Sequence, residues 1–219
     1  MKKILIDTAP GQDIDDLLAI LFALRHPGLD VVALTTVTFP VDRRARLVKR
    51  LLRYLGREHI PVAAGMQYPL RPFGEEELRR QHDERETMNH AAFAEPTDPR
   101  DAPGAEDAVD LILRMAERHA GELALACIAP LTNIACALRK SPALAGKIPA
   151  IYLMGGELAL NRVEHNVAFD WTAADLVLRS GIPLYLGTWD GTRRFVLSKE
   201  ECARFKASAQ PVCRALAEA

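Results

Sequence analysis

Four aspartates lie close together near the start of the chain, between Asp7 and Asp16. Asp7 ends an apolar run, whereas Asp13, Asp15 and Asp16 begin a segment with helical periodicity. Helix capping, worth about 0.5–2 kcal/mol, accounts for one or two of these carboxylates. Several carboxylates directed at one volume repel each other unless a cation or a proton lies between them. The segment therefore predicts a site for a hard cation, calcium or magnesium, that takes oxygen ligands.

Apolar runs typical of buried strands alternate with segments of helical periodicity along most of the chain. The expected strands cover residues 4–6, 31–37, 60–64, 122–128, 150–154 and 183–187, and the expected helices cover 13–25, 42–55, 107–119, 130–138, 172–180, 199–207 and about 211 onward. Nearly continuous apolar strands separated by helices are typical of a parallel sheet covered on both faces. We expect an α/β fold of the doubly wound, Rossmann-like type, which binds ligands where its strands end.

Residues 71–106 interrupt this alternation, because they are charged, contain proline and are only weakly periodic. We expect a long excursion with one short helix, of the kind that often forms a functional lid. The chain has 219 residues, of which 49% are hydrophobic and 26% are charged, as in an ordinary globular protein. We therefore expect a single domain over residues 1–219.

Charge and hydropathy exclude several classes of partner. The formal net charge is -1, which gives no reason to expect a nucleic-acid partner. No stretch approaches the roughly 18 apolar residues of a membrane span, and the first apolar run is too short for a signal peptide. The four cysteines lack CxxC spacing and read as free thiols in a reducing compartment. We expect a cytoplasmic protein without a membrane partner.

Six segments of the chain resemble, in order, the conserved segments of the inosine–uridine nucleoside hydrolase family. In the first segment Asp7, Pro10, Gly11, Asp15 and Asp16 fit the family signature, with two extra residues before the final pair. The others are Thr35-Thr36-Val37, Pro61-Val62-Ala63-Ala64-Gly65, Ala129-Pro130-Leu131-Thr132-Asn133-Ile134-Ala135, Leu153-Met154-Gly155-Gly156, and Glu164-His165-Asn166 with Asp170. Together they cover nearly the whole chain, so the resemblance extends to the nucleoside hydrolase fold.

The resemblance implies hydrolysis of the N-glycosidic bond of a ribonucleoside, through a transition state that resembles an oxocarbenium ion. It also implies that a calcium-bound water attacks the sugar, because a bound cation lowers the pKa of water and orients it. By resemblance, Asp16 is the principal calcium ligand, the carbonyl of Ile128 is a further ligand, and Asp7 supports the metal cluster. The expected partners are a small ribonucleoside and further copies of the chain, as a homodimer or homotetramer.

Three side chains are catalytic candidates, two of them, Asp15 and His90, by the same resemblance. Asp15 accepts hydrogen bonds from the ribose hydroxyls and belongs to the catalytic group. Asp13, in the longer turn of this sequence, is a candidate to compensate for a missing base. His90, in the long excursion, is a candidate to assist the leaving base, since histidine titrates near neutral pH. An exposed loop histidine is the alternative for His90.

Substrate contacts are expected from the segments after the later strands. By resemblance, Glu164 and Asn166 hold the ribose and Met154 lines the sugar pocket. The alternatives are that Met154 is a core residue and that Glu164 and Asn166 belong to a solvated turn. For Asn133, stabilisation of a helix start is favoured over a substrate contact.

Three departures from the family pattern bear on the activity. Ala9 stands where the family has a second aspartate, which there ligates calcium and acts as the base. Residues 38–40, Thr-Phe-Pro, replace the family's Gly-Asn after the second strand. The sequence ends at Ala219, before the family's last calcium-ligating aspartate, and we expect a truncated form of a longer protein.

Ala9 favours a second hypothesis, a nucleoside- or ribose-binding relative that has lost its catalytic base. A third hypothesis is a phosphotransferase of the haloacid-dehalogenase type with Asp7 as its nucleophile. That chemistry needs a second aspartate at the position of Ala9, and it leaves the later segments without an explanation.

Overall fold

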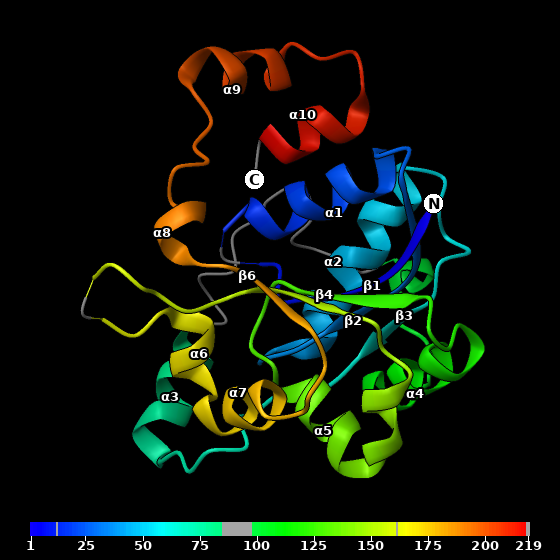
Figure 1. Ribbon diagram of the computed structural model, residues 1–219. Helices are drawn as coiled ribbons and strands as arrows, with labels where there is room; N and C mark the ends of the chain where they lie inside the picture. The colour runs from blue at the N-terminus through cyan, green and yellow to red at the C-terminus, as the bar shows by residue number, and fades with distance from the viewer. Residues whose placement is uncertain (12, 85–97, 161, 218–219) are drawn as a thin grey trace.

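A computed structural model describes residues 1–11, 13–84, 98–160 and 162–217 of the protein (Figure 1). The strands in this part of the chain are β1 Lys2–Thr8, β2 Leu29–Thr36, β3 Val62–Ala64, β4 Leu123–Cys127, β5 Ile151–Met154 and β6 Leu184–Gly187. The helices are α1 Asp15–Arg25, α2 Val41–Tyr54, α3 Glu75–Glu84, α4 Ala108–Arg118, α5 Thr132–Lys140, α6 His165–Phe169, α7 Trp171–Leu178, α8 Trp189–Thr192, α9 Lys199–Lys206 and α10 Pro211–Ala217, with 3-10 turns at Pro99–Asp101 and Pro142–Gly146.

The strands form one parallel sheet in the order β3-β2-β1-β4-β5-β6. The chain first builds the half from β1 to β3, then returns to the centre and builds the half from β4 to β6. Successive connections therefore leave β1 and β4 in opposite directions, and a crevice opens where these two strands end. The predicted doubly wound α/β fold is confirmed.

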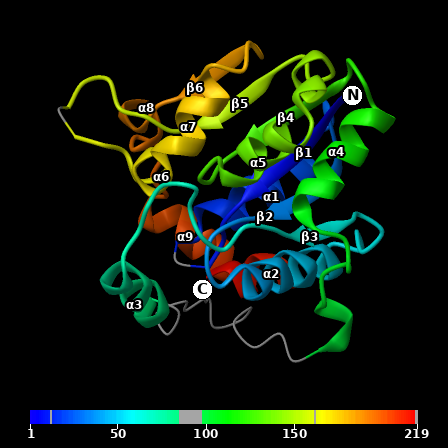
Figure 2. The same cartoon turned by 90° about the horizontal axis from the view of Figure 1, so that it is seen from below.

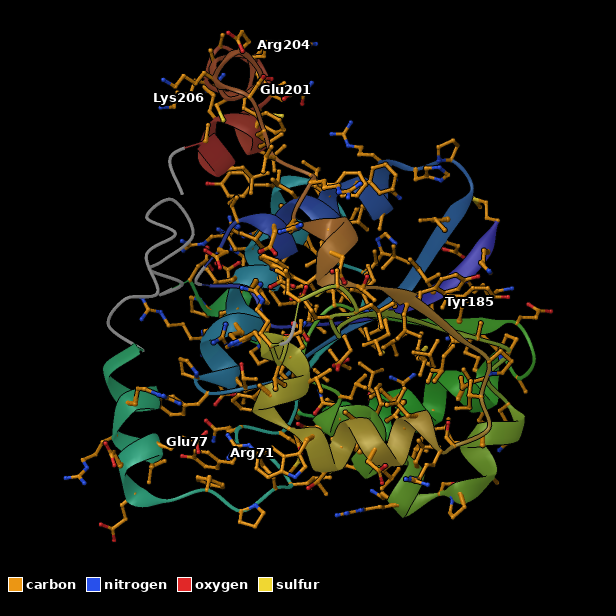
Figure 3. The ribbon with its side chains drawn as sticks, turned by 60° about the vertical axis from the view of Figure 1, so that its left-hand side comes forward. Arg71, Glu77, Tyr185, Glu201, Arg204 and Lys206 are labelled. Carbon is orange, nitrogen blue, oxygen red and sulfur yellow. The ribbon has the colours of Figure 1, made fainter. Side chains whose placement is uncertain are left out.

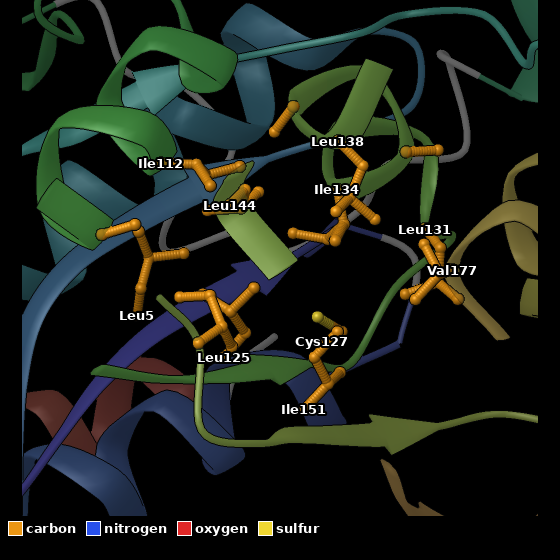
Figure 4. Packing of buried hydrophobic residues seen from close by; sticks show 14 of the residues in the cluster. Leu5, Ile112, Leu125, Cys127, Leu131, Ile134, Leu138, Leu144, Ile151 and Val177 are labelled. Carbon is orange, nitrogen blue, oxygen red and sulfur yellow. The ribbon is translucent and has the colours of Figure 1, made fainter. Parts of the chain in front are cut away.

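Helices cover both faces of the sheet, and each face has its own apolar core. Side chains of α1, α2 and α10 pack on one face, and side chains of α4, α5 and α7 pack on the other. Figure 2 looks onto the second face, with α4, α5 and α7 in front of the strands. In Figure 4, Leu5, Leu125 and Ile151 of the strands meet helix residues such as Ile112, Ile134 and Leu138. Burial of each such side chain stabilises the fold by about 1.5–3 kcal/mol.

Strand register brings polar side chains together at the carboxyl end of the sheet. A register shift between Ile4 and Leu5 precedes the pairing of Asp7 with Thr35 on β2. On its other side, Asp7 is paired with Cys127 at the end of β4. Asp7 therefore lies at the centre of the sheet edge, between the two strands that border the crevice.

The excursion over residues 71–106 contains more regular structure than one isolated helix. An ion pair between Arg71 and Glu77 ties α3 to the segment before it (Figure 3). The turn Pro99–Asp101 is anchored to α2, because the buried carboxylate of Asp101 accepts hydrogen bonds from Arg50 Nε at 3.0 Å and Arg53 Nε at 2.9 Å. His90 lies outside the described residues. In the part of the chain that is described, no helix combines the length and the apolar character needed to cross a membrane.

Candidate active site

A cavity of about 750 Å³ opens at the carboxyl end of the sheet. Its walls come from the loops after β1 and β2, from the ends of β4 and β5, from α6, and from the segment that contains α8. We call its two opposite sides the inner wall and the outer wall. The inner wall comprises Ala9, Asp13, Asp15, Asp16, Thr38 and Arg44, and the outer wall comprises Trp189, Thr192, Arg193 and Phe195.

Most of the residues selected from the sequence meet in this cavity. The residues that line it include Asp13, Asp15, Asp16, Ile128, Met154, Glu164 and Asn166. The cavity thus gathers side chains from loops more than a hundred residues apart in the sequence. Asp7 is not among the residues that line it and lies beneath the inner wall.

Asp7 is fully buried and is held by two side chains. Its Oδ1 accepts hydrogen bonds from Thr35 Oγ1 at 2.6 Å and from Asn133 Nδ2 at 2.8 Å. Its Oδ2 has no hydrogen-bond partner within the described residues. Burial raises the pKa of Asp7 to about 7, although the two hydrogen bonds act in the opposite direction. Asp7 therefore carries a proton for much of the time near neutral pH.

Asn133 joins the ends of three strands. Besides Asp7 of β1, its Nδ2 contacts the carbonyl of Thr36 on β2 at 2.9 Å, and its Oδ1 accepts the N–H of Met66 after β3 at 2.9 Å. A Cβ on Gly65 would lie 2.3 Å from this Oδ1, so only glycine fits there. The expected helix-start role of Asn133 is wrong: α5 has Leu131 as its N-cap residue, and no side chain caps it.

Asp16 lies in the inner wall, beside Asp15. Its Oδ1 accepts a hydrogen bond from Thr8 Oγ1 at 2.6 Å, and Asp15 Oδ1 accepts the N–H of Asp16 at 3.0 Å. Burial raises the pKa of Asp16 to about 7, and the charge of Asp15 adds to this, while the Thr8 hydrogen bond and the charge of Arg44 lower it. Capping does not explain these aspartates, because the N-cap residue of α1 is Ile14 and no side chain caps that helix.

Glu164 and Asn166 form an ordered corner of the cavity and not a solvated turn. Glu164 is only 4% exposed. Its carboxylate caps α6 by accepting the N–H groups of Asn166 at 2.8 Å and Val167 at 3.0 Å, and it also accepts that of Gly156 at 3.1 Å. Asn166 Nδ2 donates to the carbonyl of Met154 at 3.2 Å. Met154 is partly exposed and lines the cavity, so it is more than a core residue.

The outer wall was missed by reasoning from the sequence. Trp189 is its central side chain, with the guanidinium carbon of Arg162 3.4 Å from its ring centroid and that of Arg193 at 5.1 Å. Asp190 stands next to it but turns away to accept the N–H groups of Leu158 at 2.8 Å and Ala159 at 3.0 Å. Because α8 has only four residues, helical periodicity gave no signal for this wall.

Arg44 was also missed, although it is only 5% exposed and lies in the inner wall. Its Nη1 donates to the carbonyl of Pro10 at 2.9 Å and to that of Ala9, and its Nη2 donates to the carbonyl of Phe39 at 3.1 Å. A signal was present in the sequence, since Arg44 occupies the apolar stripe of α2 that continues through Leu47, Val48 and Leu51.

The inner wall does not supply the ligands that calcium requires. Calcium takes about 6–8 oxygen ligands, with several carboxylates among them. Across the described residues, no group of three or more His, Cys, Asp or Glu side chains is arranged to hold a metal ion. Ala9 offers only its carbonyl, which already accepts a hydrogen bond from Arg44, and Asp7 is buried below the wall.

Comparison with known proteins shows the family to which this fold and cavity belong. Residues 4–219 match the family model described as inosine-uridine preferring nucleoside hydrolase. The pyrimidine-specific ribonucleoside hydrolase RihA of Citrobacter koseri is 33% identical over 98% of this chain and 69% of its own length, and RihA of Escherichia coli strain K12 is 34% identical over the same shares. The purine-preferring ribonucleoside hydrolase of Gardnerella vaginalis has a similar structure, with a TM-score of 0.85 and 27% identity over 99% of this chain and 70% of that one. The chain thus belongs to the inosine-uridine preferring nucleoside hydrolase family of hydrolases that act on N-glycosyl compounds.

Proposed function

We propose that the cavity binds a ribonucleoside and hydrolyses its N-glycosidic bond, to give free base and ribose. One observation carries this proposal: the carboxylates of the loop after β1 and the polar corner after β5 line one cavity of about 750 Å³. A nucleoside-sized molecule fits a cavity of this class, which commonly measures about 300–1,000 Å³.

The chemistry follows from the charge of the inner wall. As the bond between the anomeric carbon and the base nitrogen breaks, positive charge develops on the ribose ring. Carboxylates already oriented beside the ring stabilise that charge without reorganising. Water supplies the new oxygen at the anomeric carbon, its released proton passes to a carboxylate, and the departing base takes up a proton.

Asp15 and Asp13 are the side chains proposed to receive the proton from water. Both are exposed to the cavity, whereas the carboxylate of Asp16 is engaged by Thr8. Glu164 and Asn166 are proposed to hold the ribose from the opposite corner, over Met154. The predicted calcium-bound water has no part in these steps, because the inner wall lacks the ligand set for that ion. His90 lies outside the described residues, so its role in assisting the leaving base stays a prediction.

A second candidate function is nucleoside or ribose binding without turnover. Ala9 favours it, since a methyl group lines the cavity at the position where the family signature has an aspartate. The two functions share the same ligand and differ only in whether the bond is broken.

Chromatography of reaction mixtures separates these two functions. Uridine, cytidine, inosine and adenosine are each incubated with the protein, and free base is measured. We expect release of base by wild type and a fall of about 10²–10⁴-fold in kcat for Asp15→Asn, the effect of losing a general base. Asp175→Asn is the matched control, because Asp175 is exposed on α7 and pairs with Arg179 outside the cavity. Binding without release of base would establish the second function. No binding of any nucleoside would refute both.

The expected homodimer or homotetramer is retained as part of this proposal. Sedimentation should show a mass two or four times that of the 24.2 kDa chain. A monomeric mass would contradict the proposed homodimer or homotetramer.

A further inference from the structure

We propose that Arg44 is a built-in counter-cation that takes the place of a metal ion in the inner wall, so that the cavity forms without any divalent cation. The inference concerns the cavity of the proposed function, but it is about how that cavity is built and not about turnover. It predicts that this chain, unlike the pattern its family signature implies, has no calcium site of useful affinity.

The position of Arg44 is the first argument. The guanidinium group reaches from α2 to the turn after β1 and binds the carbonyls of Ala9 and Pro10. Its other nitrogen binds the carbonyl of Phe39 in the turn after β2. Arg44 thus holds together two of the loops that form the inner wall, which is the structural task that a bound cation performs through oxygen ligands.

The charges around Arg44 are the second argument. Asp16 and Arg44 both line the cavity, and they are linked through Ala9, whose N–H donates to the carboxylate of Asp16 while its carbonyl accepts from Arg44. A buried guanidinium is costly unless it is paired and hydrogen-bonded. Here three carbonyls accept its hydrogen bonds, and it interacts electrostatically with the carboxylate of Asp16. A second cation beside it would be repelled.

The residue at position 9 is the third argument. The guanidinium binds the backbone carbonyl of residue 9, and the alanine side chain adds no carboxylate that would compete for it. An aspartate at this position would bring a further negative charge to the same volume, where it could pair with Arg44 or with a metal ion. Ala9 and Arg44, the cation on the apolar stripe of α2, are therefore complementary.

Calcium titration of wild type, after treatment with a chelator, is the direct test and needs no nucleoside. Calorimetry should show no saturable binding up to about 1 mM calcium, well above the affinity of ordinary sensor sites. The melting temperature should be the same with calcium and with chelator, because a ligand stabilises a fold only by binding it. A single site with a micromolar Kd, or a lower melting temperature in chelator, would overturn the inference.

A double variant, Ala9→Asp with Arg44→Met, tests the exchange in the other direction. It adds a carboxylate and removes the guanidinium, so calcium should bind at least about tenfold more tightly than to wild type and should raise the melting temperature. Ala9→Asp alone should gain no calcium site, because Arg44 pairs with the new carboxylate. A folded double variant that binds calcium no better than wild type would count against the inference.

Two further variants separate charge from packing. Lys49→Met is the matched control on α2, since Lys49 is partly exposed and donates to the carbonyl of Glu58 at 3.3 Å. Its calcium response should equal that of wild type. Arg44→Lys keeps the charge and should remain insensitive to calcium in combination with Ala9→Asp. If Ala9→Asp with Arg44→Lys bound calcium as tightly as Ala9→Asp with Arg44→Met, the positive charge at position 44 would not be what prevents calcium binding. Loss of nucleoside hydrolysis alone would refute the proposed function and leave this inference intact.

Discussion

Opposite walls of the cavity are held by different kinds of contact. Beneath the inner wall, Asp7 and Asn133 are completely buried and join the ends of β1, β2 and β3 through hydrogen bonds of 2.6–2.9 Å. The outer wall contains Phe195, which is 89% exposed, and Trp189, whose ring lies close to the guanidinium groups of Arg162 and Arg193. It follows β6, whose side chains are largely exposed.

The contrast separates what the fold fixes from what it leaves adjustable. Buried polar groups that lack a partner are costly, so the inner wall cannot change shape without loss of stability. In the outer wall, Trp189 is partly exposed, and Arg193 and Phe195 are exposed beyond the short helix α8, so these side chains carry little of the folding energy. We therefore expect substitutions beneath the inner wall to affect stability first, and substitutions in the outer wall to affect ligand binding alone.

Asn133→Ala is expected to have the largest effect. It leaves the buried carboxyl group of Asp7, the buried carbonyl of Thr36 and the partly buried N–H of Met66 without their common partner. Loss of about 3–5 kcal/mol in the free energy of unfolding should follow, measured by urea denaturation with the m-value unchanged.

Asn166→Ala is the control for that measurement, because Asn166 is partly exposed and donates to the carbonyl of Met154. It should lower the free energy of unfolding by about 1 kcal/mol or less and weaken nucleoside binding. The contrast between the walls would fail if Asn133→Ala were as mild as Asn166→Ala.

The second effect is a dependence of stability on pH that arises beneath the inner wall. The folded-state pKa of Asp7 is about 7, above the value of about 3.9 in an unfolded chain. Between these values the folded protein binds a proton that the unfolded chain has released, so stability contributed by this group falls as the pH rises from about 4 to 7 and is constant above. The pKa of Asp16 is also about 7, so it acts in the same direction.

Asp7→Asn isolates the share of Asp7, because an amide oxygen can still accept from Thr35 and Asn133. Wild type should lose stability between pH 5 and 7 through Asp7, whereas the variant should not. The free energy of unfolding of the variant, relative to that of wild type, should therefore rise by about 2–3 kcal/mol over this range. Urea denaturation at several pH values measures the difference. Groups with a lowered pKa, such as Asp101 and Glu77, are common to both proteins and cancel. Parallel curves for the two proteins would show that Asp7 is ionised in the folded state throughout.

The fold was predictable because its central strands, β1, β2 and β4, are buried on both faces. Such strands appear in the sequence as continuous apolar runs, and a predicted strand at 150–154 corresponds to β5 Ile151–Met154. Helices α6 and α8 were not predicted, because five and four residues are too few to show a period of 3.6. In addition, α6 is capped by Glu164, which is not among the usual N-cap residues.

The aspartates of the inner wall could be predicted, whereas Arg44 and the outer wall could not. The family resemblance selected Asp15, Ile128 and Met154, and a parallel sheet brings the ends of β1, β4 and β5 to one edge, which explains why these residues meet. Arg44 was hidden because a charged residue in a helix is normally assigned to the solvent-exposed side. The position of Trp189 depends on how the chain turns after β6, for which the sequence contains no local pattern.

The smallest effect on stability is expected in the outer wall, from Trp189→Ala. Its ring lines the cavity, and loss of an aromatic surface should weaken nucleoside binding by about tenfold, or about 1.4 kcal/mol. The free energy of unfolding should change by about 1 kcal/mol or less, because the ring contacts exposed arginines and not the core.

The other tryptophan supplies both the control and the reporter for this prediction. Trp171 is 54% exposed on α7, outside the cavity, and its ring centroid lies 5.0 Å from the guanidinium carbon of Arg71. In Trp171→Phe the fluorescence comes from Trp189 alone, so a nucleoside that enters the cavity should quench it and give the affinity directly. If Trp189→Ala instead unfolded the protein as readily as Asn133→Ala, the outer wall would be as integral to the fold as the inner one, and the distinction between fixed and adjustable walls would have to be abandoned.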